Sequence, residues 1–267
     1  MIFDISIVYY YIFDIRQCKN KAHSERIKDY LAELGISGEY VFPSQVRTSK
    51  ELVRDAIQRN FSTVVAIGND ALINTVASEL VGAKTAFGMI PLNASTEINN
   101  LVNGSDWHSA AKNLRFRKID EVRLGRFENG QHFLISTELK ITHPVNITLE
   151  FDGFIAQARA KKLLIRNINP TAKDNRNNLL DILLISESER EARPISRLLK
   201  YLEISAQSND VLNTSRFKAP RLRVFSHKNL NFIINKEDVA TTPQLIESSP
   251  EILRLIVHRD TRFDRKS

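Results

Sequence analysis

The sequence contains almost no cysteine and lacks the common signatures of hydrolases and P-loop enzymes. Its single cysteine, Cys18, excludes an internal disulfide framework and a zinc site built from cysteines, and favours a reducing compartment. There is no Gly-x-Ser-x-Gly elbow and no Walker lysine motif, and the six histidines show no metal-ligand spacing. We therefore expect no resident metal site, and surface or packing positions for the histidines.

The apolar N-terminal stretch lacks the charge pattern of a targeting segment. MIFDISIVYYYIFDI contains no Lys or Arg and includes Asp4 and Asp14. A signal peptide opens with positive charge, and a membrane-spanning helix needs about 20 apolar residues. We expect a buried strand here and a cytoplasmic protein, with peripheral attachment to a membrane left open.

The composition is that of a globular protein with unevenly distributed charge. Hydrophobic residues make up 42% and charged residues 26% of the 267 residues, a length that suits two domains. Residues 1–124 hold 15 Lys and Arg against 14 Asp and Glu, whereas residues 125–267 hold 23 against 17. Attraction for an anionic partner should therefore belong to the C-terminal half.

Strand and helix patterns alternate through the first 120 residues. Buried-strand runs occupy residues 5–12, 63–68 and 85–92, and helical periodicity occupies residues 22–34, 71–81 and 105–114. Another helix is predicted after Thr48 and Glu51, which have capping-box spacing. This alternation predicts a three-layer α/β domain over residues 1–120, with a mostly parallel sheet between helices.

Short strand patterns dominate the second half, and turn residues separate them. They cover residues 121–125, 132–138, 145–151, 155–168, 179–186, 221–226 and 231–235, with one predicted helix over residues 189–202. We expect an antiparallel β-sandwich domain over residues 121–267. A last strand at residues 252–257 could return to either domain.

Two strand ends in the first domain are followed by loops that could hold an anion. The first segment runs Gly68-Asn69-Asp70-Ala71-Leu72-Ile73-Asn74, and the second, 23 residues after Gly68, runs Pro91-Leu92-Asn93-Ala94-Ser95-Thr96-Glu97. In such a turn, backbone N–H groups and a helix N-terminus point toward a phosphate.

These segments resemble the GGDGT-[IL]-NE and P-L-G-T-x-N-D motifs of the diacylglycerol kinase catalytic-domain family, which includes bacterial lipid kinases and sphingosine kinases. NAD kinases share a GGDGT-like motif, but the second segment and the downstream fragments fit the lipid-kinase branch better. The resemblance continues at residues 118–133, 165–167 and 179–182, and at Asn235-Lys236-Glu237 with Thr242-Pro243, although residues 138–145 look shortened. It implies ATP- and Mg-dependent phosphoryl transfer to a lipid hydroxyl, and a lipid or anionic membrane surface as partner.

The resemblance also implies the site residues. Those matching the nucleotide motifs are Gly68, Asn69, Asp70, Asn74, Asn93, Thr96 and Glu97. The catalytic segment of the family matches Asn235 and Glu237, and no protein-held metal site is implied. ATP and Mg are the expected cofactors if nucleotide binding is retained.

Several motif positions depart from the family pattern. Asn69, Ala71 and Asn93 replace glycines, and Leu72 and Ala94 replace threonines. A left-handed backbone costs a residue with a Cβ roughly 1–2 kcal/mol, so Ala71 predicts a turn of changed shape.

The catalytic aspartate of the family is also replaced, by Asn235. An amide cannot accept a hydroxyl proton, and losing a general base lowers a rate by about 10²–10⁴-fold. We therefore expect weak or no phosphoryl transfer.

Ordinary structural roles would explain the same residues. Asp70 could cap a helix, Glu97 could be an acid favoured by a helix dipole, and Asn235 and Glu237 could be plain turn residues.

Two further functions stay open. One is an active kinase that uses Asp70, Glu97 and Glu237 in altered geometry. The other is a non-enzymatic scaffold or polyanion-binding module that uses basic residues two apart on strands: Arg159 and Lys161, Arg216 and Lys218, Arg221 and Arg223. A solvated outer face would explain these basic pairs equally. Phe217 is the single aromatic residue that lies within one of these pairs, which is too little for a base-stacking platform, so we expect no nucleic-acid partner; a homodimer is left open.

Overall fold

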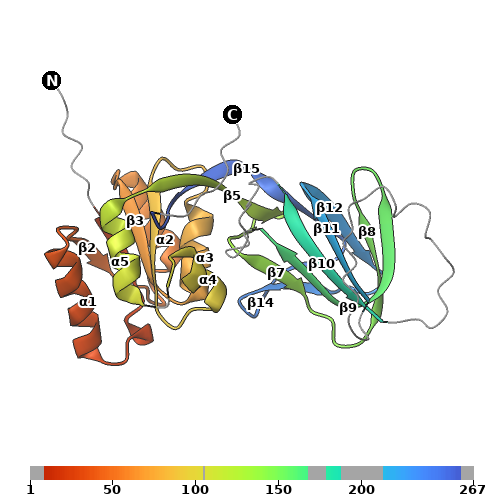
Figure 1. Cartoon of the computed structure of the whole chain (residues 1–267), viewed down its shortest axis with the longest axis horizontal. Coiled ribbons are helices and arrows are strands. Elements are labelled where there is room, and N and C mark those ends of the chain that lie inside the picture. The colour runs from red at the N-terminus through yellow and green to blue at the C-terminus, as the bar shows by residue number, and fades with distance from the viewer. Residues whose placement is uncertain (1–8, 105, 168–178, 188–212, 260–267) are drawn as a thin grey trace, which may run out of the picture. The chain divides into compact units, whose positions relative to one another are not determined.

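The computed structural model describes residues 9–104, 106–167, 179–187 and 213–259, and these form two compact units (Figure 1). The first unit contains residues 9–104, 106–124 and 249–259 of the described chain, and the second contains residues 125–167, 179–187 and 213–248. Two long strands, β5 (Ile119–Phe127) and β15 (Gln244–Ile256), begin in one unit and end in the other.

The first unit is built on a parallel sheet. Its elements are β1 (Tyr9–Phe13), η1 (Ile15–Gln17), α1 (Lys21–Glu33), β2 (Gly38–Val41), α2 (Ser49–Gln58), β3 (Thr63–Gly68), α3 (Asp70–Glu79), β4 (Ala86–Pro91), α4 (Thr96–Leu101) and α5 (Trp107–Phe116). The strand order is β2-β1-β3-β4, and the end of β15 lies parallel to β4, with Leu255 opposite Phe87. Every residue of β1, β3 and β4 is buried, as expected for strands covered on both faces.

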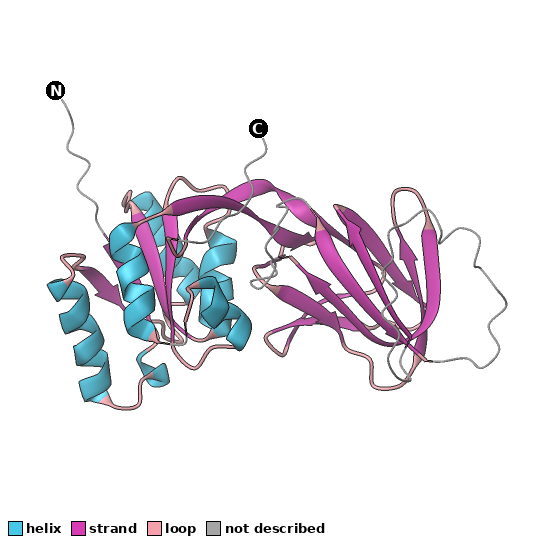
Figure 2. Ribbon diagram, in the orientation of Figure 1, coloured by secondary structure: helices cyan, strands magenta, loops and turns pink. Residues whose placement is uncertain are grey.

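Helices cover both faces of this sheet (Figure 2). Successive side chains of a strand point to opposite faces. The Tyr9 hydroxyl donates to the Leu114 carbonyl of α5 at 3.0 Å, whereas the Tyr10 hydroxyl donates to the Asp55 carboxylate of α2 at 2.9 Å. These contacts place α5 on one face and α2 on the other, which gives three layers.

The predicted capping box is confirmed at the start of α2. The Thr48 hydroxyl accepts the Glu51 N–H at 3.3 Å, and the Glu51 carboxylate accepts the Thr48 N–H at 2.7 Å. Two short elements that the sequence patterns do not predict are also present, the edge strand β2 and the six-residue helix α4.

The second unit is antiparallel. Besides parts of β5 and β15, its strands are β6 (His132–Phe133), β7 (Ser136–Leu139), β8 (Val145–Glu150), β9 (Ile155–Arg166), β10 (Leu180–Ser186), β11 (Asn213–Ala219), β12 (Arg221–Ser226), β13 (Asn231–Ile234) and β14 (Glu237–Thr241). Its core includes three packed rings: Phe127 lies 5.7 Å from Phe133 and 5.5 Å from Phe232 between centroids. The predicted fold class, an α/β domain followed by an antiparallel β domain, is confirmed. The helix predicted over residues 189–202 lies outside the described residues.

Candidate functional site

Three loops of the first unit meet at the carboxyl edge of its parallel sheet. They follow β1, β3 and β4, which are hydrogen-bonded neighbours. The Asp14 N–H donates to the Ile67 carbonyl at 2.9 Å, and the Leu92 N–H donates to the Gly68 carbonyl at 2.8 Å, so pairing continues to the end of each strand. Ligands of open parallel sheets usually bind at this edge.

The loop after β3 leads directly into a capped helix. Asn69 has an extended backbone, with φ −83° and ψ 179°, and its side chain accepts the Leu72 N–H at 3.1 Å. Ala71 is the second residue of α3 and is helical. Ala71 is therefore not in a left-handed conformation, because the helix begins at Asp70.

The glycine replacement in the loop after β4 does occupy a left-handed conformation. Asn93 has φ 53°, a region that Asn tolerates better than most residues. Its side-chain N–H groups donate to the Gln17 carbonyl at 3.0 Å and to Gln17 Oε1 at 3.3 Å. Asn93 thereby ties the loop after β4 to the loop after β1.

Asp70 joins the two segments that resemble the family motifs. It is the first residue of α3, and the cap itself is Asn69, so the N-cap interpretation of Asp70 is wrong. Its Oδ1 instead accepts the backbone N–H of Ser95 at 2.8 Å. Because Ser95 caps α4, one carboxylate oxygen links the N-terminal ends of two helices.

The remaining motif residues surround this link. Thr96 and Glu97 are exposed and form the first turn of α4, where an acid interacts favourably with the helix dipole. Asn74 lies one helical turn after Asp70 on α3 and is half-buried. The seven residues predicted to bind nucleotide thus lie in two segments, one from the end of β3 into α3 and the other from the loop after β4 into α4.

Gly68 is closely packed against the side chain of Leu72. A Cβ at this position would lie 2.8 Å from Leu72 Cδ2 and 3.4 Å from Asp14 Cβ. Leu72, which stands where the family has a threonine, is itself buried against the strand end. The position that supplies a hydroxyl in the family is therefore filled by apolar packing.

Asp14 also lies at the carboxyl edge of the parallel sheet, although no sequence motif marks it as a site residue. Its carboxylate accepts the Arg16 Nε–H at 2.7 Å and the Gln17 amide at 3.3 Å, and its side chain is 8% exposed. Burial alone would raise the pKa of this carboxyl, but the hydrogen bonds from Arg16 and Gln17 lower the pKa below its ordinary value of 3.8. A buried, ionised aspartate therefore holds the loop to which Asn93 is bonded.

This network predicts an acid-sensitive contribution to stability. Because the folded-state pKa of Asp14 is lowered, the stabilisation is present above 3.8 and is lost as the pH falls below that value. We expect the free energy of unfolding of the wild type to exceed that of Asp14→Asn at neutral pH, and the difference to shrink on acidification. Urea denaturation of both proteins across this range measures it. A difference independent of pH would contradict the assignment.

Asn235 and Glu237 lie in a hairpin of the second unit. Asn235 and Lys236 form the two-residue turn between β13 and β14, with φ 52° and 72°, and Ile234 pairs with Glu237. Left-handed angles at both positions are typical of a type I′ turn. The side chains of Asn235 and Glu237 are exposed.

Neither a metal cluster nor a spanning helix occurs in the described part of the chain. Among these residues, no group of three or more His, Cys, Asp or Glu side chains could hold a metal ion. None of the described helices is long and apolar enough to cross a membrane.

Solved structures of bacterial proteins have a fold similar to that of this chain. A crystal structure of a candidate diacylglycerol kinase from Bacillus anthracis strain Sterne has a TM-score of 0.74 at 14% identity, covering 95% of this chain and 98% of that one. A crystal structure of a diacylglycerol kinase from the same strain has a TM-score of 0.71 at 14% identity, covering 95% and 97%. No curated protein sequence matches the chain.

The fold is thus that of a two-domain protein with an α/β unit followed by a β-rich unit, as in these bacterial structures. Residues 16–127 match the family model of the diacylglycerol kinase catalytic domain. This segment contains both motif loops.

Proposed function

We propose that this protein is a lipid-kinase homologue that binds ATP as its magnesium complex but transfers phosphate to a lipid hydroxyl weakly or not at all. The observation that carries the proposal is the bond from the Ser95 N–H to Asp70 Oδ1, at 2.8 Å. It holds the first turns of α3 and α4 beside each other at the sheet edge.

Backbone groups at this edge fit a phosphate chain. The first N–H groups of a helix have no acceptor within the helix, and they carry partial positive charge. In α3 these include the N–H groups of Asp70 and Ala71, since the Leu72 N–H is bonded to the Asn69 side chain. This supports phosphate binding without help from a Walker lysine.

The acids at the edge favour a nucleotide that brings its own cation. Asp70 and Glu97 lie in the first turns of α3 and α4, and their carboxylates would repel bare phosphates. Mg²⁺ is commonly bound by one or two carboxylates together with substrate phosphates and water. Asp70 and Glu97 would hold such an ion, which when bound neutralises phosphate charge.

Three replaced motif residues, Leu72, Ala94 and Asn235, are the reason to expect impaired phosphoryl transfer. Leu72 places buried apolar packing where the family has a hydroxyl, and Ala94 removes the second one. Asn235 presents an amide where the family has its aspartate base. Losing a positioned donor lowers a rate by about 10²–10³-fold at a charge-stabilising site, and losing a base lowers it by about 10²–10⁴-fold.

A polyanion-binding role has less support, because three basic residues considered for it are paired with acids. Arg159 lies 3.1 Å from Glu187, Arg216 lies 2.6 Å from Asp181, and Arg221 lies 2.6 Å from Asp152. These pairs are what an ordinary solvated sheet face would show.

Calorimetric titration with ATP, followed by a lipid phosphorylation assay, tests the proposal. We expect ATP to bind in the presence of Mg²⁺ and at least about tenfold more weakly after chelation, because the carboxylates then repel the phosphates. Failure to bind at millimolar Mg-ATP would remove the nucleotide-binding part. Diacylglycerol phosphorylation at about 1–100 s⁻¹, the usual kinase range, would instead establish the active-kinase alternative.

A further inference from the structure

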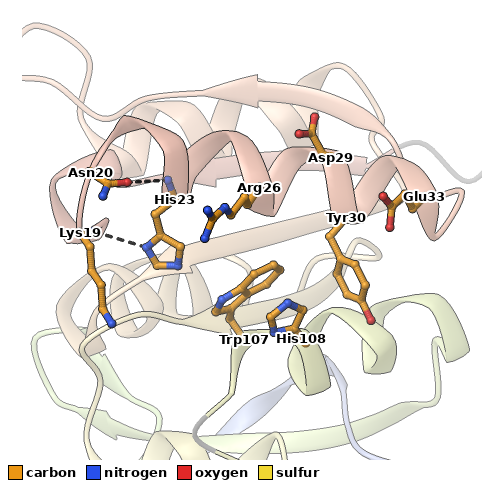
Figure 3. A pocket seen from close by; sticks show the side chains of 9 residues that line it. All are labelled: Lys19, Asn20, His23, Arg26, Asp29, Tyr30, Glu33, Trp107 and His108. Carbon is orange, nitrogen blue, oxygen red and sulfur yellow. Dashed lines mark hydrogen bonds between the residues drawn. The ribbon is translucent and has the colours of Figure 1, made fainter.

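A groove between α1 and α5 contains charged and aromatic side chains that the sheet-edge site does not use. It has a volume of about 560 Å³ and is lined by Lys19, Asn20, His23, Arg26, Asp29, Tyr30, Glu33, Trp107 and His108 (Figure 3). Small-molecule sites typically measure about 300–1,000 Å³. None of these residues is among those predicted to bind nucleotide.

One face of α1 gives the groove a charge gradient. His23, Arg26, Tyr30 and Glu33 follow the spacing of a single helix face. The groove therefore has Lys19 and Arg26 toward the start of α1, and the ring of Tyr30 with the carboxylates of Asp29 and Glu33 toward its end. Arg26 and Glu33 are two turns apart, a separation of about 10 Å along the axis.

The start of α5 supplies a stacked pair of aromatic rings opposite this helix. The rings of Trp107 and His108 stack with centroids 3.6 Å apart and an interplanar angle of 24°. Tyr30 meets both edge-on, 5.5 Å from Trp107 and 4.9 Å from His108. Asp106 Oδ1 lies 2.8 Å from His108 Nδ1 and fixes that ring.

The basic end of the groove is available to an anion. Within the part of the chain that the structure describes, neither Lys19 nor Arg26 forms an ion pair, whereas Lys28 of the same helix pairs with Glu25 at 3.1 Å. The Lys19 N–H donates to His23 Nδ1 at 3.3 Å, which leaves the other ring nitrogen of His23 for a ligand. In Figure 3, Arg26 and His23 lie beside the indole of Trp107.

We propose that this groove binds a nucleoside monophosphate whose base carries an amino group, with adenosine monophosphate as its representative. The phosphate would lie among Lys19, His23 and Arg26, the base would stack on the Trp107–His108 surface, and the amino group would donate to Glu33. The site is independent of the proposed nucleotide site at the sheet edge.

Fluorescence of Trp107, the single tryptophan of the chain, reports directly on this groove. We expect adenosine monophosphate to change the fluorescence saturably without Mg²⁺. Adenosine and inorganic phosphate, each lacking one half of the ligand, should bind at least about tenfold more weakly, since a factor of ten corresponds to one lost charged contact. Inosine monophosphate, which has a carbonyl in place of the amino group, should also bind more weakly because Glu33 would repel it.

Two matched variants decide whether the ligand lies here. Arg26→Ala should weaken binding of adenosine monophosphate about tenfold, from the loss of one charged contact, and Lys28→Ala, which removes the same charge from α1 outside the groove, should leave it unchanged. Asp70→Asn should also leave it unchanged. Equal affinities of the wild type and Arg26→Ala, or loss of the response in Asp70→Asn alone, would overturn the proposal.

Discussion

Replacing Asn235 with aspartate is expected to raise the rate of diacylglycerol phosphorylation by about 10²–10⁴-fold, the usual contribution of a general base. The turn should accept the change, because Asn235 is exposed at φ 52° and aspartate tolerates this left-handed region nearly as well as asparagine. Transfer of labelled phosphate from ATP to diacylglycerol in mixed micelles measures the gain.

Asn235→Gly is the matched control. Glycine also adopts a positive φ without strain but offers no carboxylate, so its rate should stay at the wild-type level. If Asn235→Asp also stayed there, the missing base would not be what limits the reaction. The replacement of two family threonines by Leu72 and Ala94 would then be the main cause of the low rate, and restoring threonine at both would be the next variant.

The strands of the first unit could be predicted because burial leaves a clear trace in the sequence. The uninterrupted apolar runs that predict β3 and β4 are buried throughout. The edge strand β2 gives no such trace, since three of its four residues are only partly buried. The six-residue α4 is too short to show helical periodicity.

Motif resemblance located the candidate loops but could not give their backbone geometry. It treated Asn69, Ala71 and Asn93 alike as replaced glycines, whereas only Asn93 has a positive φ. Whether a motif position lies in the turn or in the helix depends on which residue caps the helix. Here Asn69 is the cap, so the residues after it follow helical rules.

Contacts between distant residues could not be predicted from local patterns. The bond from the Ser95 N–H to Asp70 joins residues 25 positions apart, and it exists because β3 and β4 are neighbours in the sheet. The groove likewise brings α1 and α5 together, so its histidines carried no recognisable spacing in the sequence. Both features follow from topology, which a single sequence specifies only indirectly.

The link through Asp70 leads to a second large expected effect, on nucleotide affinity. Asp70→Asn keeps an oxygen that can accept the Ser95 N–H but removes the negative charge. If the carboxylate helps to hold the magnesium ion of bound ATP, Mg-ATP affinity should fall at least about 10–100-fold, the loss that removing even an outer-shell partner of a metal causes. Calorimetric titration measures the affinity, and thermal unfolding should show little change.

Asp70→Ala separates the two roles of this side chain. It removes both the charge and the acceptor, so the Ser95 N–H loses its partner and the protein should be less stable as well as weaker in binding. Glu25→Gln, which removes the same charge from an exposed position of α1 outside the groove, should bind Mg-ATP like the wild type. Unchanged Mg-ATP affinity in Asp70→Asn would mean that Asp70 only ties the loops together. Any phosphate binding at the edge would then come from the helix N-termini alone.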